Sequence, residues 1–169
     1  MVFKGSNSKK GNVVLETITI ILVLIFFAVT SIFGYQMFDE LNTDIQADTT
    51  MGNESKEISG NLHGKYANLF DNLILMAFVL LFAGVLISTF MLDSNPLFFV
   101  LSLVAMISLF VVAAILGNTY ESIMMGGDIS VYANQFTYTT WLMTHILELA
   151  IGSAFAIAFT LFAKNKLFT

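Results

Sequence analysis

The chain has 169 residues, of which 57% are hydrophobic and only 11% are charged, and its formal net charge is −5 at pH 7. A soluble domain of this length has too little interior to bury so much apolar surface, so the composition predicts a membrane protein. Cysteine and arginine are both absent, which excludes disulfides and thiolate metal sites and argues against a specific nucleic-acid partner.

Four apolar runs are each long enough to cross a bilayer, which takes about 20 mainly apolar residues in a helix. They predict an all-α integral membrane protein with four transmembrane helices, at residues 13–38, 69–92, 97–117 and 140–163. A lysine-containing flank, residues 1–12, precedes the first span, and a short tail, residues 164–169, follows the fourth.

The first helix is expected to continue beyond the bilayer. Phe38, Leu41 and Ile45 recur at helical spacing between acids and amides, which is typical of an amphipathic helix. Residues 39–66 are therefore predicted to form a polar, acidic outer loop that is partly helical. After Asp48 the sequence TTMGNESKEISGNLHGK is polar and contains glycine, and we expect it to be a linker.

Spans two and three are expected to form an antiparallel hairpin, because only a short inner turn, residues 93–96, separates them. Pro96 is tolerated in the first turn of the helix that follows. A second outer loop, residues 118–139, ends with Phe136 and Tyr138, and Trp141 comes soon after. These aromatic side chains are typical of the belt at the headgroup level of a bilayer.

The distribution of lysines predicts the orientation, because inner flanks and short inner loops are enriched in basic residues. Lys4, Lys9 and Lys10 precede the first span, and Lys164 and Lys166 follow the last. The loops on the opposite side carry most of the acidic residues. We therefore predict that both termini lie on the cytoplasmic side, or on the interior side if the membrane belongs to a particle.

Polar side chains at membrane depth are costly and are candidate functional residues. His145 and Glu148 are three residues apart and would share one helix face, while Asp71 and Asn118 fall at a similar depth on neighbouring spans. Together they could hold a metal or relay protons, or they could only align the helices by hydrogen bonds. We favour alignment, because four-helix di-metal proteins supply two Glu-x-x-His motifs and this chain has one, in reversed order. No catalytic residue, metal ligand or cofactor is therefore predicted.

Small residues that permit close helix packing are the more informative signal. The fourth span contains the small-xxx-small pairs Gly152/Ala156 and Ala150/Ala154, which let helix backbones approach closely. Their expected counterparts lie in the second and third spans, at Gly84, Ala113 and Gly117. The pattern predicts helix packing, either within one chain or between copies of it.

The stretch KKGNVVLETITIILVLIFF, from Lys9 to Phe27, resembles the processing site of type IV prepilins. The resemblance implies cleavage after Gly11, and it implies that Glu16, the fifth residue after it, pairs with the N-terminus of a neighbouring subunit. A pilin leaves the membrane with a single helix, whereas three further spans would hold this chain in lipid. We interpret the match as coincidental and the first span as an uncleaved anchor, in which Glu16 gains from Lys9, Lys10 and the helix N-terminus.

A broader resemblance, over residues 9 to 121, is to small uncharacterised membrane proteins of viruses that contain a lipid layer. Its most telling pieces are DSNPLFF, residues 93–99, and AILGNTYE, residues 114–121. The resemblance implies a structural component of a virion membrane that lies under or among capsid proteins, and it brings no catalytic residues with it.

The sequence thus predicts a non-enzymatic structural protein of a virion membrane that links an internal bilayer to an outer protein shell. The expected partners are the lipid bilayer, other membrane or capsid proteins, and further copies of the chain by lateral association. Two alternatives stay open: an accessory subunit of a cellular membrane complex, and a holin-like pore former. A pore former would need a continuous polar helix face, for which the serines and threonines of spans two and three are too sparse.

Overall fold

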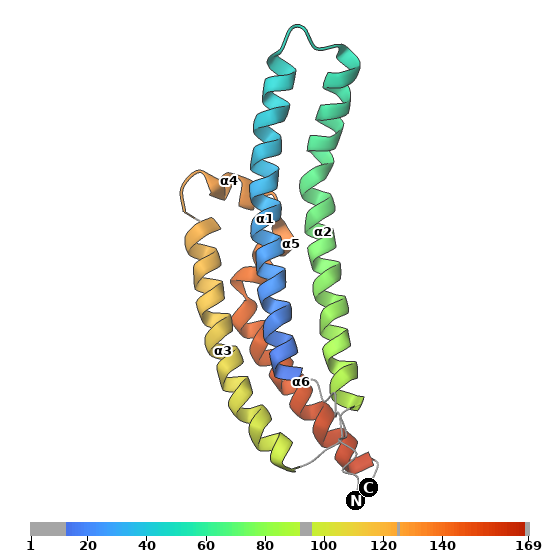
Figure 1. Cartoon of the computed structure of the whole chain (residues 1–169), viewed down its shortest axis with the longest axis vertical. Coiled ribbons are helices and arrows are strands. Elements are labelled where there is room, and N and C mark those ends of the chain that lie inside the picture. The colour runs from blue at the N-terminus through green and yellow to red at the C-terminus, as the bar shows by residue number, and fades with distance from the viewer. Residues whose placement is uncertain (1–12, 92–95, 125, 168–169) are drawn as a thin grey trace, which may run out of the picture.

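The computed structural model describes residues 13–91, 96–124 and 126–167. Within these residues the chain forms helices and no strand, which confirms the predicted all-α fold (Figure 1). The elements are α1 (Val13–Ala47), α2 (Asn53–Met91), α3 (Pro96–Met124), α4 (Ile129–Ala133), α5 (Thr137–Thr144) and α6 (Ile146–Leu167). The N-terminal flank with Gly11, the turn at residues 92–95 and residues 168–169 lie outside the described residues, as does the side chain of Glu16.

Three helices, α1, α2 and α3, are long and apolar enough to cross a membrane, and the bent pair of α5 and α6 is a fourth candidate. Their outward faces carry large apolar side chains such as Phe26, Leu80, Ile107 and Phe155, which are 63% to 75% exposed. Exposed apolar surface of this extent is unfavourable in water, so a bilayer is the solvent that suits it. The start of α1 and the end of α6 lie toward the same end of the bundle (Figure 1).

Helices α1 and α2 form an antiparallel hairpin that extends well past the rest of the bundle (Figure 1). They contain 35 and 39 residues and are joined by the turn at residues 48–52. Asp48 shapes this turn, because its Oδ1 accepts hydrogen bonds from the backbone N–H and the hydroxyl of Thr50, each at 2.7 Å. We call this turn the tip of the hairpin.

The prediction of a linker after Asp48 was wrong, because the chain is helical again from Asn53. Glycine at two positions in this segment disfavours a helix by about 1 kcal/mol each, but contacts with α1 offset that cost. The hydroxyl of Ser59 donates to Asn42 Oδ1 at 2.9 Å, and Lys56 Nζ donates to the backbone oxygen of Gln46 at 2.8 Å. Such tertiary contacts were not visible in the sequence.

The fourth span is not one straight helix, as the predicted span at residues 140–163 required. Helices α5 and α6 are bent by 69° at the break, where His145 has φ −106° and ψ 21°. Backbone hydrogen bonds continue on both sides, from His145 N to Trp141 O (3.1 Å) and from Leu149 N to His145 O (3.0 Å). No proline lies in α5, in α6 or between them, and we infer that the bend originates in the contacts that hold α5.

The second predicted outer loop is also more ordered than expected. Helix α3 begins at Pro96, which confirms the predicted place of that proline, but it continues to Met124 instead of ending near residue 117. The short helices α4 and α5 follow almost at once and pack against α1 and α2, respectively. The main core contains residues of all six helices, and among its fully buried members are Ile32, Ile74, Leu109 and Ala113.

Candidate functional site at the base of the hairpin

Five ring side chains run along the contact between α1 and α2, and we call them the aromatic column: Tyr35, Phe38, His63, Tyr66 and Phe70. Tyr35 stacks on His63 with ring centroids 5.2 Å apart, and Tyr66 stacks on Phe70 at 4.5 Å. The rings meet because they recur three or four residues apart on each helix, which places them on one face. The column joins the two helices where the hairpin leaves the bundle.

Helices α4 and α5 press against this column from one side. Tyr132 of α4 and Phe136, at the start of α5, meet the ring of Tyr35 edge-on, at centroid distances of 6.1 and 5.8 Å. Phe136 is fully buried. Edge-to-face pairs contribute about 0.5–1.5 kcal/mol each beyond the area they bury. The base of the hairpin is therefore held against the rest of the molecule and not only within itself.

The carboxylate of Asp39 adds a polar contact beside the column. Its Oδ1 lies 2.7 Å from His63 Nε2 on α2. The carboxylate also lies near Tyr132 on α4: desolvation raises the pKa of Tyr132, and the negative charge of Asp39 raises it further. Asp39 thus connects three helices, α1, α2 and α4, at one point.

Asp71, on α2, binds the first turn of α5. Its Oδ1 accepts a hydrogen bond from the N–H of Thr139 at 2.7 Å, and its Oδ2 accepts one from the N–H of Tyr138 at 2.9 Å. The first N–H groups of a helix lack intrahelical partners and carry partial positive charge, so a carboxylate satisfies both needs. Asp71 is buried, and the N-cap residue of α5, Phe136, makes no side-chain capping bond. The cap is therefore supplied across space by α2.

A hydroxyl network continues from this cap toward α3. The hydroxyl of Thr140 donates to the backbone oxygen of Ala133 at 2.9 Å and lies 3.2 Å from the hydroxyl of Tyr120. Together with Asp71 it fixes α5 on two sides. Because α5 is held in this direction while α6 follows the apolar core, the chain bends between them.

The four members of the predicted polar cluster, His145, Glu148, Asp71 and Asn118, do not share a contact among the described hydrogen bonds and ring contacts. The prediction that His145 and Glu148 share one helix face was wrong, because the break places His145 at the end of α5 and Glu148 in the first turn of α6. His145 is exposed and stacks on Trp141, with ring centroids 4.9 Å apart. Glu148 and Asn118 are exposed as well. Among the residues that the structure describes, no group of three or more acids and histidines could hold a metal ion.

The small residues divide into two sets. Ala113, Ala150 and Ala154 are buried within the bundle, and Gly117 lies so close to its neighbour that an added Cβ would be 3.0 Å from Ile146 Cγ2. Gly84 and Gly152 face open space, with no atom within 4 Å of an added Cβ, and Ala156 is partly exposed. The first set packs α3, α5 and α6 together inside the chain, and the second set is free for contacts with other molecules.

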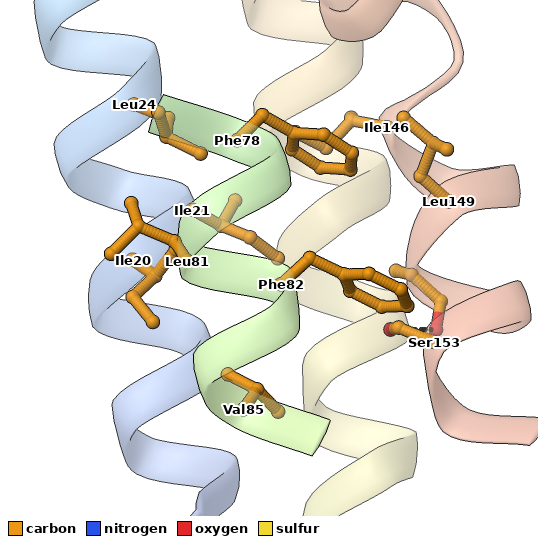
Figure 2. A pocket seen from close by; sticks show the side chains of 11 residues that line it. Ile20, Ile21, Leu24, Phe78, Leu81, Phe82, Val85, Ile146, Leu149 and Ser153 are labelled. Carbon is orange, nitrogen blue, oxygen red and sulfur yellow. Dashed lines mark hydrogen bonds between the residues drawn. The ribbon is translucent and has the colours of Figure 1, made fainter. Parts of the chain in front are cut away.

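An apolar recess lies between α1, α2 and α6, and Figure 2 shows Phe78 and Phe82 of α2 pointing into it toward α6. Its volume is about 40 Å³. The one polar side chain on its wall, Ser153, already donates its hydroxyl to the backbone oxygen of Ala150 at 2.7 Å. A recess this small, without free polar groups, has no means to orient a substrate and is a packing gap.

Sequence reasoning singled out Asp71 but did not identify its partner, the first turn of α5, and it missed the aromatic column. The spacing of the five rings at three and four residues was a signal for one helix face. The sequence held no sign that the faces of α1 and α2 would meet, because residues 49–65 were predicted to be a linker.

Neither a protein-family model nor a curated protein nor a solved structure matches the chain.

Proposed function

We propose that the chain is a non-enzymatic, structural membrane protein that links a lipid bilayer to a protein layer outside it. The observation that carries this proposal is the length of the α1–α2 hairpin. At a rise of 1.5 Å per residue, helices of 35 and 39 residues are about 52 and 58 Å long. The apolar core of a bilayer is about 30 Å thick, so about 20 Å of paired helix stands beyond it.

The level of the bilayer surface follows from the aromatic side chains that face outward. Tyr138 and Trp141 of α5 are about half exposed, and rings with a polar edge favour the headgroup region. Asp71 contacts α5 at this level. The part of the hairpin between Tyr35 and Tyr66, including the tip, then lies in water.

The contacts at the base suit a rigid spacer. The aromatic column, Asp39 and the cap by Asp71 hold α1, α2, α4 and α5 together where the hairpin leaves the membrane. A hairpin fixed in this way would hold its tip at a constant distance from the lipid. The buried carboxylate of Asp71 and the hydroxyls of Tyr120 and Ser153 are used in helix contacts, which supports a structural role over a catalytic one.

The lipid-containing virion is the setting that the sequence resemblance favours. There the lysine-rich ends would face the particle interior, and the acidic tip would reach the shell. An accessory subunit of a cellular membrane complex has the same geometric requirements, and the identity of the outer layer separates the two.

Cross-linking from the tip of the full-length chain in its native membrane tests the proposal. The chain has no cysteine, so Met51→Cys introduces a single reactive thiol at the exposed tip, to which a photoactivatable cross-linker is attached. We expect cross-links to a protein outside the bilayer, present at a fixed copy ratio by mass spectrometry. A capsid protein would identify the virion, and an enzyme subunit would identify the cellular complex.

Phe155→Cys is the matched control, because Phe155 is 75% exposed on α6 at membrane depth. It should cross-link to lipid or to neighbouring membrane proteins and not to the outer layer. If the tip captures no protein, and the chain is recovered only as a homo-oligomer that conducts ions, the linking role is wrong and the pore-forming alternative takes its place.

A further inference from the structure

The part of the hairpin that we place in water still exposes large apolar side chains. Met37 and Leu41 on α1 are 71% and 52% exposed, and Ile58 and Leu62 on α2 are 54% and 56% exposed. All four lie on the tip side of the Tyr35–Tyr66 stack. Lipid tails would not reach them there, so their exposure has no explanation in the solvation of a membrane span.

These side chains lie on one side of the hairpin. Successive helical residues are rotated by about 100°, so Met37 and Leu41, each two residues from Asp39, point about 200° away from it. Asp39 lies on the α4 side of α1, because its charge acts on Tyr132 of α4 and Tyr35, one turn earlier, meets the ring of Tyr132 edge-on. Leu62 precedes Asp71 by nine residues, or about two and a half turns, and Asp71 faces α5. Both apolar pairs therefore face away from α4 and α5, and we call this side the open face.

Charge decides what can cover the open face. Between residues 39 and 65 there are six carboxylates and two lysines, and Lys56 already donates to the backbone oxygen of Gln46. On α1 the apolar row continues into Asp44 and Asp48, at spacings that keep them on the same face. A second copy of the hairpin would bring like charges together, and anionic lipid would be repelled in the same way.

We propose that the open face binds a segment of a different protein, one that carries lysine or arginine beside apolar side chains. The proposal rests on the proposed linking function and specifies the chemistry of the partner. The apolar side chains of the segment would cover Met37, Leu41, Ile58 and Leu62, and its basic side chains would lie beside Asp44 and Asp48. Apolar contact at the centre and charge at the rim is the usual arrangement of a protein interface.

A peptide-binding measurement tests this chemistry without knowledge of the natural partner. The probe is a fluorescent 18-residue amphipathic peptide of leucine and lysine, and the receptor is the full-length chain in phosphatidylcholine nanodiscs, with empty nanodiscs as the blank. We expect saturable binding above the blank that weakens as salt is raised, because exposed charges are screened. A peptide with glutamate in place of lysine should bind at least about tenfold more weakly.

Variants of the chain locate the surface. The double variant Leu41→Ser/Asp44→Lys removes one apolar and one acidic contact of the open face, and it should weaken binding about tenfold or more. Glu57→Lys is the matched control, since it changes the net charge as Asp44→Lys does. Glu57 is rotated by about 100° from Ile58 and 140° from Leu62, away from the open face, so this variant should bind almost as the parent chain does.

Four results would overturn the proposal. If peptide binding does not exceed the blank, the open face does not recognise basic apolar segments. The same conclusion follows if all variants bind the peptide as tightly as the parent chain does. An equal loss in Glu57→Lys would mean that only net charge matters. Disulfide-linked dimers of Leu41→Cys under mild oxidation would identify a second copy as the occupant. If any of these occurs while Met51→Cys still cross-links to an outer protein, the linking function stands and only the partner chemistry is wrong.

Discussion

The helices are held together by different kinds of contact at the two ends of the bundle. Toward the end where α1 begins and α6 finishes, the helices meet through apolar side chains and small residues such as Ala150 and Ala154. Toward the tip they meet through stacked rings, the Asp39–His63 contact and the buried Asp71. In lipid the hydrophobic effect does not drive helices together, so close packing of side chains holds the helices at the apolar end. In water, charged helices need specific polar partners to stay paired.

The comparison predicts that polar substitutions near the tip end have larger effects than apolar ones at the lipid surface. Asp71→Ala should have the largest effect. It removes two charge-assisted hydrogen bonds and leaves the N–H groups of Tyr138 and Thr139 without partners, which we expect to lower the free energy of unfolding by about 2–4 kcal/mol. Thermal unfolding in detergent, with hydrogen exchange at Tyr138 and Thr139, measures both consequences.

Asn72→Ala is the control for this substitution, because Asn72 is the next residue, is exposed and bonds within its own helix to Asn68. It should change the stability by less than about 0.5 kcal/mol. Asp71→Asn keeps an acceptor but loses the charge, and it should fall between the two. If the amide hydrogens of α5 exchanged at the same rate in Asp71→Ala as in the parent chain, the cap by Asp71 would not be what holds α5.

Replacing glycine by leucine at two positions, Gly117 and Gly84, tests the packing of the apolar end. Gly117→Leu would force a side chain against Ile146 and Met143, and overpacking of this kind costs about 1–3 kcal/mol. Gly84→Leu adds a side chain where no atom lies within 4 Å, so it should leave the unfolding temperature unchanged or raise it slightly. A large loss at Gly84 would mean that another molecule or copy packs on that face.

Tyr66→Leu and Phe26→Leu compare two aromatic side chains of different surroundings. Tyr66 stacks on Phe70, Tyr35 and Phe38, whereas Phe26 is 73% exposed. We expect the first change to cost about 1 kcal/mol and to quicken hydrogen exchange between the column and the tip. The second should cost less than about 0.5 kcal/mol. Similar effects of both would show that the column does not hold the hairpin.

The sequence allowed the apolar end to be predicted and failed at the polar end, for a physical reason. A span is a property of about 20 consecutive residues, so the starts of α1 and α3 could be anticipated, and Ala113 and Ala150 could be singled out as packing residues without knowing whether their partner was the same chain or another copy. The cap of α5, the helix that ends at the bend, comes from Asp71, which is 67 residues away from Tyr138 along the chain. Local patterns carry no information about such a pair. The same is true of residues 53–66, where contacts with α1 override the low helix propensity of glycine.

The smallest expected effect is at the tip, where Asp48 is partly exposed and its carboxylate accepts hydrogen bonds from its own turn. The hydroxyl and N–H of Thr50 hold the pKa of Asp48 below its ordinary value of 3.8. Because the pKa is lower in the folded chain than in the unfolded chain, the ionised carboxylate stabilises the turn at pH values above the unfolded pKa. This stabilisation is lost as the pH falls through the folded pKa.

The NMR chemical shift of the Thr50 amide should therefore stay constant from pH 7 to about 4 and change only below about pH 4. In Asp48→Asn the change should disappear, while the unfolding temperature of the bundle stays the same. A midpoint at or above 3.8 would mean that the tip is not closed by Asp48 in solution, and a partner at the tip would then meet a looser surface than the one described.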